Sequence, residues 1–468
     1  MIFIVGAGPG DSGLLTLRGC DVLKRADAVI FDHLVGEGVL AMIPESAEKF
    51  DAGKFSGSHT MTQAEIESLM ISLARSGKNV VRLKGGDPYV FGRGGEEAEA
   101  VIKAGLPFEI VPGVTSAVSV PAYAGIPVTH RDYCSGLRIF TARDKDGKIP
   151  DFSGATSVFL MGVSNSEALQ ERLLAEMPGE TPCAVIQNGT LASQRTVRTT
   201  VSELHSSVTK NKISAPAIIV AGRTAALNLK FNLSLSGKRI VITRPEKRSE
   251  KLSRILKDKG AEVILLPTIK TRTIHGALDG VELGGFGWVG FTSVTGVEAF
   301  FELLGETGRD VREIGRAKIA AIGQATKDAL TSHGLRVDYI PEIFDGENLA
   351  LGLAEKVSIN EKILMFRAEN GTPEISQTFR NYGINAEQIC IYRTDYVKLT
   401  CVPKFADIII FTSSSTVRGF AENTGSLRDS TAVCIGKQTA DEARREGFER
   451  IRIANQASVE AIAEACEQ

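Results

Sequence analysis

The chain has 468 residues, more than one hydrophobic core usually spans, so its length predicts about two to four domains. Its composition, 43% hydrophobic and 24% charged, is that of a globular protein, and the formal net charge of -2 gives no reason to expect a nucleic-acid partner. The N-terminus enters a predicted strand without a basic leader, and no apolar stretch reaches membrane-spanning length, which favours a cytoplasmic protein.

Short β-branched runs alternate with helical stretches along the chain, which is the pattern of α/β folds with largely parallel sheets. In the first half we predict strands at Ile2–Val5, Ala28–Phe31, Val80–Leu83, Ser157–Leu160, Ala184–Ile186 and Ala217–Val220. In the second half we predict strands at Arg239–Thr243, Glu262–Leu266, Trp288–Phe291, Lys318–Ile322, Lys362–Phe366, Ile408–Phe411 and Thr431–Ile435. The polar segment 228–237 separates the two series, so we place the main boundary near residue 234.

The cysteines and histidines indicate neither a disulfide framework nor a metal site. The six histidines show no HxxxH or HExxH spacing, so we expect no metal. The seven cysteines lack CxxC spacing and are odd in number, which we interpret as buried, reduced thiols. They are Cys20, Cys134, Cys183, Cys390, Cys401, Cys434 and Cys466.

The first strand runs into a glycine-rich turn, Val5-Gly-Ala-Gly-Pro-Gly-Asp11. A dinucleotide-binding GxGxxG loop would need a third glycine where Asp11 stands, and Pro9 would stiffen the loop where a phosphate should approach. The pattern therefore argues against NAD or FAD, although a loop of this kind can receive an uncharged nucleoside. A nucleotide-linked oxidoreductase remains the alternative for this half.

A second glycine-rich block, Arg82-Leu-Lys-Gly-Gly-Asp-Pro-Tyr-Val-Phe-Gly-Arg-Gly-Gly-Glu96, follows an apolar strand. Glycines let backbone press against a ligand, and loops after strands are where α/β proteins bind small molecules. The alternative is an ordinary glycine-rich turn. The length and mixed charge of the block favour a binding loop.

The second half repeats itself. Phe291-Thr-Ser-Val-Thr-Gly-Val297 recurs as Phe411-Thr-Ser-Ser-Ser-Thr-Val417, and Ala321-Ile-Gly-Gln-Ala-Thr326 recurs as Cys434-Ile-Gly-Lys-Gln-Thr439, which indicates two similar lobes. Each FTS element follows a strand and precedes a helix, so its hydroxyl groups either cap that helix alone or also contribute to an anion-binding site.

Several motifs of the first half occur together in one family. These motifs are the GAGPGD opening, Phe31-Asp-His-Leu-Val35, the RLKGGDPYVFGRGGEE block, Pro112-Gly-Val-Thr-Ser-Ala117 and Gly125-Ile-Pro-Val-Thr-His-Arg-Asp132. Because of them, residues 1–231 resemble uroporphyrinogen-III C-methyltransferases. The resemblance implies a tetrapyrrole methylase fold of two α/β subdomains with S-adenosylmethionine bound between them. It assigns the cofactor contacts to Pro9, Gly85, Gly86, Asp87, Val90, Thr115, Ser116, Met161 and Gly189.

The same resemblance makes Asp32 the proton acceptor and Lys54 the proton donor, or the partner of a substrate carboxylate. From the residues alone, Asp32 could instead cap a helix, and Lys54 could be a solvated surface lysine. The chain departs from the family pattern at two places, which we expect to alter substrate contacts and leave the cofactor site intact. They are Leu160, where an aromatic residue is usual, and Thr141-Ala-Arg143, where Thr-Gly-His is usual.

Residues 237–468 resemble uroporphyrinogen-III synthases through Val241-Ile-Thr-Arg-Pro245, the FTS pair, Ala321-Ile-Gly323 and Ile391-Tyr-Arg-Thr394. The resemblance implies two flavodoxin-like lobes joined by a two-stranded connection, one at 237–270 with 396–468 and the other at 273–392. The implied reaction closes hydroxymethylbilane with inversion of its last ring and needs no cofactor. Tyr392 is the candidate acid, or else a strand tyrosine that bridges the lobes.

The substrate's carboxylates are expected to bind at Thr292, Ser293, Thr412, Ser413 and the adjacent helix N-termini. We therefore predict a bifunctional enzyme that makes uroporphyrinogen III and methylates it twice to precorrin-2, the precursor for sirohaem or cobalamin. Its partners are small tetrapyrroles, without nucleic acid or membrane, and we expect a homodimer through the methyltransferase half. The alternative is an oxidoreductase fused to a bilobed ligand-binding module.

Overall fold

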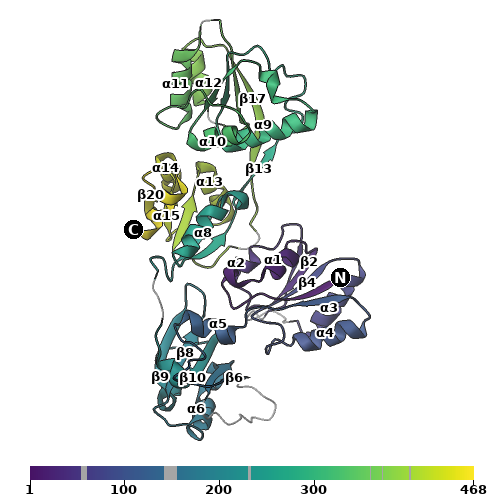
Figure 1. The fold of residues 1–468 in the computed structure, drawn as a ribbon, viewed down its shortest axis with the longest axis vertical. Coiled ribbons are helices and arrows are strands. Elements are labelled where there is room, and N and C mark those ends of the chain that lie inside the picture. Colours follow the sequence, from purple (N-terminus) through teal and green to yellow (C-terminus); the bar gives the residue numbers. More distant parts are fainter. Residues whose placement is uncertain (54–60, 142–154, 230–232, 359, 372, 400–401) are drawn as a thin grey trace. The chain divides into compact units, whose positions relative to one another are not determined.

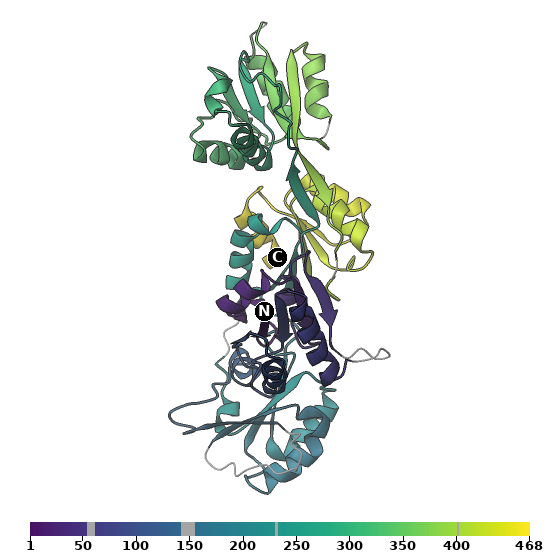
Figure 2. The same cartoon turned by 90° about the vertical axis from the view of Figure 1, so that its right-hand side faces the viewer.

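The computed structural model describes residues 1–53, 61–141, 155–229, 233–358, 360–371, 373–399 and 402–468. These residues form two compact units, one of residues 1–266, 399–417 and 424–468 and the other of residues 267–398 and 418–423. The first unit contains three five-stranded sheets and the second contains one, each flanked by helices (Figures 1 and 2). The predicted α/β class is confirmed.

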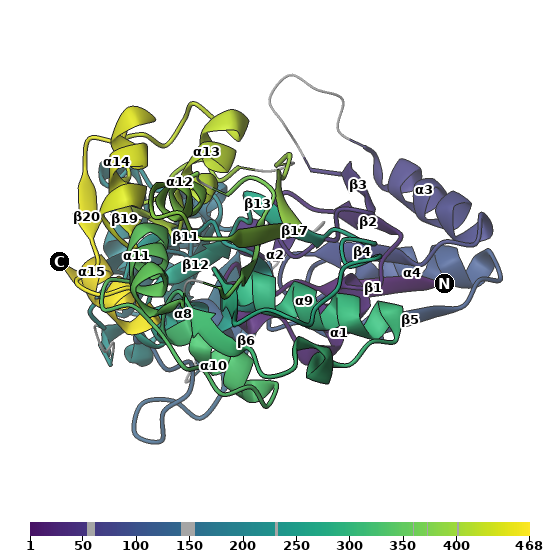
Figure 3. The same ribbon diagram turned by 90° about the horizontal axis from the view of Figure 1, so that it is seen from above.

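The first sheet is entirely parallel, in the order β3-β2-β4-β1-β5. Neighbouring residues such as Val29 and Ile30 point to opposite faces, so both faces are apolar and both are covered by helices. Helices α1 and α2 cover one face, while α3 and α4 run next to each other over the other (Figure 3). The elements are β1 Ile2–Gly6, α1 Leu17–Leu23, β2 Ala28–Phe31, α2 Glu37–Leu40, β3 Glu48–Asp51, α3 Gln63–Arg75, β4 Val80–Lys84, α4 Gly94–Lys103 and β5 Phe108–Val111.

The second sheet is mixed, in the order β6-β7-β10-β8-β9. Strands β7 and β8 both run antiparallel to β10, so their carboxyl ends lie at the same edge. Helix α5 packs against this sheet, and Figure 1 places α5 between the first two sheets. The elements are α5 Ser116–Tyr123, β6 Leu137–Thr141, β7 Thr156–Leu160, α6 Ser166–Leu174, β8 Pro182–Gln187, β9 Arg195–Thr200, α7 Leu204–Lys210 and β10 Ala217–Ala221.

The third sheet is parallel, in the order β12-β11-β18-β19-β20, and its core is closed by α8 and α15. Two distant segments of the chain therefore build one lobe, because β11 pairs with β12 on one side and with β18, from the C-terminal region, on the other. The elements are β11 Arg239–Ile242, α8 Glu250–Asp258, β12 Glu262–Leu265, β18 Ile408–Phe411, α13 Ser414–Asn423, β19 Thr431–Cys434, α14 Lys437–Arg445, β20 Ile451–Ile453 and α15 Val459–Glu467.

The fourth sheet, in the second unit, has the order β13-β17-β16-β14-β15. Only β13 runs antiparallel, and it pairs with the long strand β17. Helices α9 and α10 cover one face, and α11 and α12 cover the other. The elements are β13 Ile269–Thr273, β14 Trp288–Phe291, α9 Val294–Thr307, β15 Lys318–Ala321, α10 Gln324–Ser332, α11 Gly346–Lys356, β16 Ile363–Ala368, α12 Glu374–Asn381 and β17 Ala386–Tyr396.

Every strand predicted from the sequence is present, with small shifts at the ends. The strands that the sequence pattern did not predict are β3, β5, β6, β9, β13, β17 and β20. All of these except β17 form an edge of their sheet. None of the helices in the described ranges is long and apolar enough to cross a membrane.

Candidate active sites

Three loops meet at the carboxyl edge of the first sheet, after the neighbouring strands β4, β1 and β5. The Gly8 amide donates a hydrogen bond to the Gly86 carbonyl at 3.2 Å, and the Gly86 amide donates to the Gly8 carbonyl at 2.7 Å. The Gly113 amide donates to Asp87 Oδ2 at 3.0 Å. The predicted cofactor residues Gly86 and Asp87 therefore lie beside the loop that carries Pro9.

Glycine is required where these loops touch. A Cβ on Gly113 would lie 2.2 Å from the Gly86 carbonyl oxygen and 2.7 Å from Gly6 Cα, so no side chain fits there. Gly86 itself has a left-handed φ of 71°, and among the described residues only Ser116 N, at 3.8 Å, lies near the position of its missing Cβ. The loops thus press together on one side and leave Gly86 open beside the start of α5.

Helix α5 connects the loops of the first sheet to the second sheet. Thr115 caps it, with Oγ1 accepting a hydrogen bond from Ala117 N at 3.3 Å, so the two predicted residues Thr115 and Ser116 form the helix N-terminus. One turn later Val120 is buried against the second sheet. A Cβ on Gly189 would lie 2.3 Å from Val120 Cγ1, so the Gly189 loop packs directly on this helix.

The carboxyl edge of the second sheet carries an unusual backbone. Met161 after β7, and Asn188 and Thr190 after β8, have φ values of 58°, 50° and 69°. Left-handed conformations at non-glycine residues are costly and occur preferentially at functional sites. Met161 is 48% exposed. The predicted residues Met161 and Gly189 therefore stand at one edge, within strained turns.

The edges of the two sheets are joined by hydrogen bonds that sequence reasoning missed. Asp11 N donates to Thr190 Oγ1 at 3.2 Å, and the Tyr123 hydroxyl donates to Asp11 Oδ2 at 2.8 Å. Burial, the charge of Asp11 and this hydrogen bond raise the pKa of Tyr123 above its ordinary value. In the sequence Asp11 stood out only because it replaced the third glycine of a dinucleotide loop.

Asp32 follows β2 and takes part in a buried ion cluster. Its carboxylate pairs with Arg82 Nη2, and its Oδ2 lies 3.8 Å from Lys84 Nζ. Both cations also contact Glu97. The nearby helix α2 is preceded by Gly36 without a side-chain cap, so Asp32 does not serve as the cap considered above.

The other residues named for the methyltransferase half lie in a loop, at the end of a strand or outside the described residues. Gly85 and Val90 belong to the loop after β4, where Val90 N donates to the Asp87 carbonyl at 3.3 Å. Leu160 ends β7. Lys54, Ala142 and Arg143 lie outside the described residues.

In the second unit the structure brings together two predicted residues. The Tyr392 hydroxyl lies 2.8 Å from Ser293 Oγ, and Ser293 caps α9 by accepting a hydrogen bond from Gly296 N at 2.9 Å. Tyr392 is 8% exposed. Thr292 Oγ1 donates to the Phe366 carbonyl at 3.4 Å. The first FTS element is thus a helix cap that also holds the phenol of Tyr392.

The second FTS element, in the first unit, forms a similar helix start. Ser413 Oγ accepts from Thr416 N at 3.3 Å and lies 2.8 Å from Ser415 Oγ. Thr412 precedes it after β18. Arg244, after the adjacent strand β11, has a buried Nε without a hydrogen-bond partner among the described residues, and burial, with Arg248 nearby, lowers the pKa of Arg244. In the sequence, Arg244 belongs to the Val241-Ile-Thr-Arg-Pro245 motif, which was the feature that could have identified it.

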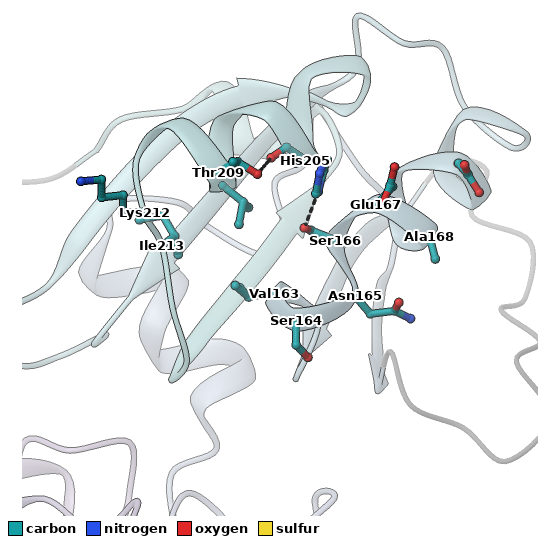
Figure 4. Close-up of a pocket in the computed structure, with 12 residues that line it drawn as sticks. Val163, Ser164, Asn165, Ser166, Glu167, Ala168, His205, Thr209, Lys212 and Ile213 are labelled. Atoms are coloured by element: carbon teal, nitrogen blue, oxygen red, sulfur yellow. Dashed lines mark hydrogen bonds between the residues drawn. The ribbon is translucent and has the colours of Figure 1, made fainter.

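A cavity of about 460 Å³ opens between α6 and α7, and none of the predicted site residues lines it (Figure 4). Ser166 Oγ lies 3.0 Å from His205 Nδ1 across it, which joins the first residue of α6 to α7. His205 N also donates to Gln170 Oε1 on α6. These contacts pack two helices together. Within the described ranges, no group of three or more His, Cys, Asp or Glu residues is placed to hold a metal ion.

Comparison with known proteins separates the same two halves. Residues 1–205 match the family model for Tetrapyrrole (Corrin/Porphyrin) Methylases, and residues 250–464 match Uroporphyrinogen-III synthase HemD. The Porphyrin biosynthesis protein HemD of Ruminiclostridium josui is 39% identical over 98% of this chain and 96% of its own length. The Siroheme synthase of Shigella dysenteriae serotype 1 is 41% identical over 49% of this chain and 51% of its own length.

Solved structures also show similarity to part of the chain. A uroporphyrin-III-C-methyltransferase from Thermus thermophilus is 38% identical over 48% of this chain and 94% of its own, with a TM-score of 0.43. A mutant uroporphyrinogen III synthase from the same species is 16% identical over 49% of this chain and 97% of its own, with a TM-score of 0.37.

The two family-model matches define a class of two-part α/β enzymes in which a tetrapyrrole methylase precedes a uroporphyrinogen-III synthase. With 39% identity over nearly the whole of both chains, this protein belongs to the family of the Ruminiclostridium josui porphyrin-biosynthesis protein and is a bifunctional enzyme of tetrapyrrole biosynthesis. The oxidoreductase and ligand-binding alternatives are therefore wrong.

Proposed function

We propose that the chain converts hydroxymethylbilane to uroporphyrinogen III and then methylates this product twice to precorrin-2, for sirohaem or cobalamin synthesis. The methyltransferase proposal rests on one observation, which is that the loops after β1, β4 and β5 contact one another beside the start of α5. Support also comes from the matches to both families, and from a Thermus thermophilus methyltransferase, 36% identical over 93% of its chain, that was solved with S-adenyl homocysteine.

S-adenosylmethionine fits the groups at this edge. It supplies, when bound, an electrophilic methyl group on a sulfonium. Backbone amides at the start of α5, and the open side of Gly86, offer donors and space to an uncharged nucleoside and a carboxylate. We assign this role to Pro9, Gly85, Gly86, Asp87, Val90, Thr115, Ser116, Met161 and Gly189. The Asp87 carboxylate already accepts hydrogen bonds from Tyr89 N and Gly113 N, so we expect its role to be shaping the loop.

Asp32 is the proposed proton acceptor. Methylation forms a bond from the methyl carbon to a pyrrole carbon and breaks the bond from that methyl to sulfur, and the cationic ring system then releases a proton. Asp32 can accept this proton because its side chain is 30% exposed at the loop edge while paired with buried cations. Lys54 is proposed to donate a proton or to bind a substrate carboxylate.

For the synthase we propose that Tyr392 protonates the leaving hydroxyl group of hydroxymethylbilane, whose carbon–oxygen bond breaks with release of water. Its hydroxyl is held by Ser293, which supports a fixed donor direction. Substrate carboxylates would bind at Thr292, Ser293, Thr412 and Ser413, with Arg244 as a further positive charge beside β18. The reaction loses one water and needs no oxidant or cofactor.

The test is an assay of the full-length protein with hydroxymethylbilane, with and without S-adenosylmethionine. We expect the product to be uroporphyrinogen III without S-adenosylmethionine and precorrin-2 with it. Isomers I and III can be separated by chromatography after oxidation to porphyrins. Isomer I alone would contradict the synthase proposal, and unmethylated uroporphyrinogen III with the cofactor present would contradict the methyltransferase proposal.

A further inference from the structure

We propose that Glu97 is a positioning residue for methyl transfer, holding Asp32 in place through two buried cations. This inference rests on the proposed role of Asp32. Glu97 lies in the first turn of α4 and has no solvent exposure. Its Oε1 accepts hydrogen bonds from Arg82 Nε at 2.9 Å and Lys84 Nζ at 3.0 Å. A third donor, Gln63 Nε2 of α3, lies at 3.3 Å.

The same two cations connect Glu97 to Asp32. Arg82 uses Nε for Glu97 and Nη2 for Asp32, so one rigid guanidinium spans both carboxylates. Lys84 Nζ lies 3.0 Å from Glu97 Oε1 and 3.8 Å from Asp32 Oδ2. Arg82 and Lys84 are 2% and 3% exposed, so bulk water solvates neither charge. The cluster therefore balances two cations against two carboxylates.

Local sequence explains how the cluster forms. Arg82 and Lys84 are two residues apart on β4, so both side chains leave the same face of the strand. Helix α4 begins directly after Arg93, whose φ is 59°, and a Cβ on Gly94 would lie 2.5 Å from the Pro88 carbonyl oxygen. This tight turn starts α4 where Glu97 faces the strand, whereas the adjacent Glu96 pairs with Arg93 in solvent.

Stability alone does not account for Glu97. Buried ion pairs are often no more stabilising than apolar side chains of the same volume. Glu97 Oε2 is moreover buried without a hydrogen-bond partner among the described residues, which costs free energy. The burial of Glu97 is explained if its negative charge is needed to hold Arg82 and Lys84 where both also contact Asp32. Without that charge, both cations would be free to reorient around Asp32.

The experiment compares Glu97→Gln, Asp32→Asn and the double variant in the full-length protein, with supplied uroporphyrinogen III and S-adenosylmethionine. We expect Glu97→Gln to lower kcat for methyl transfer at least tenfold while the KM for S-adenosylmethionine stays within about twofold, because the cofactor loops are untouched. In the Asp32→Asn background, Glu97→Gln should cause little further loss, because Glu97 acts through Asp32.

Two controls make the outcome decisive. Glu109→Gln makes the same change on β5, where the carboxylate pairs with Arg18 at the surface, and should leave methyl transfer unchanged. Glu97→Asp should recover part of the lost rate if the negative charge matters. Normal kcat in Glu97→Gln, or equal losses from Glu97→Gln in both backgrounds, would overturn the inference. Full activity of Asp32→Asn would instead overturn the proposed role of Asp32.

If Glu97→Gln does not fold, Gln63→Leu gives a milder variant, because it removes one neutral donor to Glu97 and keeps all four charges. We then expect a smaller loss of kcat that again disappears in the Asp32→Asn background. A loss that persists in that background would contradict the inference.

Discussion

At the scale of single residues, Gly113 decides how closely the loops of the first sheet approach. Replacing it by alanine puts a Cβ 2.2 Å from the Gly86 carbonyl oxygen, so one of the two loops must move. We expect Gly113→Ala to weaken S-adenosylmethionine binding at least tenfold in calorimetry. Gly95→Ala is the matched control, since no atom of the residues that the structure describes lies within 4 Å of its Cβ position. Equal binding by both variants would contradict the assigned cofactor site.

Asp32→Asn should slow methyl transfer by roughly 10²- to 10⁴-fold, the range for loss of an acid–base group. Cofactor binding should persist, because the loops after β1, β4 and β5 do not contain Asp32. Single-turnover rates together with calorimetry separate the two effects. A variant that turns over normally would reduce Asp32 to a structural partner of Arg82.

The buried cysteines give a prediction about pH. Burial raises the pKa of the thiols of Cys183, Cys434 and Cys466 to about 12, whereas an unfolded thiol ionises near 8.5. Between these two pKa values the folded state keeps thiol protons that the unfolded state releases. The contribution of the thiols to the free energy of unfolding is therefore complete below about pH 8.5 and is lost as pH rises towards 12. Urea denaturation should show falling stability over this range, with a weaker fall in Cys183→Ala.

Labelling provides an independent check on the same thiols. In the native protein at neutral pH, the buried thiols Cys183, Cys434 and Cys466 should react with a thiol reagent more slowly than the partly exposed Cys20. Peptide mapping after brief labelling measures the order. Rapid labelling of Cys183 in the folded protein would contradict its burial. Cys401 lies outside the described residues.

At the scale of elements, the two FTS segments combine helix capping with the proposed substrate contacts. Replacing Thr292, Ser293, Thr412 and Ser413 by alanine should lower the yield of isomer III and let isomer I accumulate, since hydroxymethylbilane closes without inversion when it is free. Methylation of supplied uroporphyrinogen III should continue. A folded variant that makes isomer III at the parental rate would limit these residues to capping.

A control distinguishes capping from chemistry. Loss of a cap typically costs about 1 kcal/mol, which the Ser458→Ala variant also incurs at the start of α15 without touching an FTS element. Tyr392→Phe keeps the ring and removes the hydroxyl that Ser293 holds. We expect Tyr392→Phe to slow the synthase, and Ser458→Ala to leave the isomer ratio unchanged.

At the scale of the whole molecule, the first unit joins the methylase half to the β11 lobe through a buried arginine. Arg239 Nη1 lies 2.7 Å from Glu37 Oε2 of α2, and its Nη2 lies 2.8 Å from Glu262 Oε1 of β12. Ala192 N also donates to Glu262 Oε2 at 2.7 Å. The two halves therefore share contacts that a boundary placed from sequence did not anticipate.

We nevertheless propose that fragments 1–234 and 237–468 fold and keep their separate activities. Each described sheet draws all its strands from one fragment, and Arg239 retains Glu262 after separation. Because Arg239 loses Glu37, the synthase fragment should unfold at a lower urea concentration than the same lobe in the intact chain. Insoluble or inactive fragments would contradict the proposed boundary.

The sequence alone determined the buried strands and the family motifs. Strands such as Ile2–Gly6 have apolar residues on both faces, so a continuous hydrophobic run marks them. Edge strands such as Arg195–Thr200 and Glu48–Asp51 are largely polar, because one side or face meets solvent, and their pairing depends on partners distant in the chain. The glycine blocks likewise identified the loops near Gly86 without showing what they touch.

Only the tertiary structure decided which of these residues act together. Arg82, Lys84 and Glu97 appeared as charges within one glycine-rich block, and Asp32 belonged to a separate motif. Parallel pairing of β2 with β4 places Asp32 beside Arg82, and the tight turn into α4 brings Glu97 inward. A pattern along the chain records spacing within an element, whereas ion pairs and hydrogen bonds depend on how elements pack. For this reason the link from Glu97 to Asp32 is visible only in the fold.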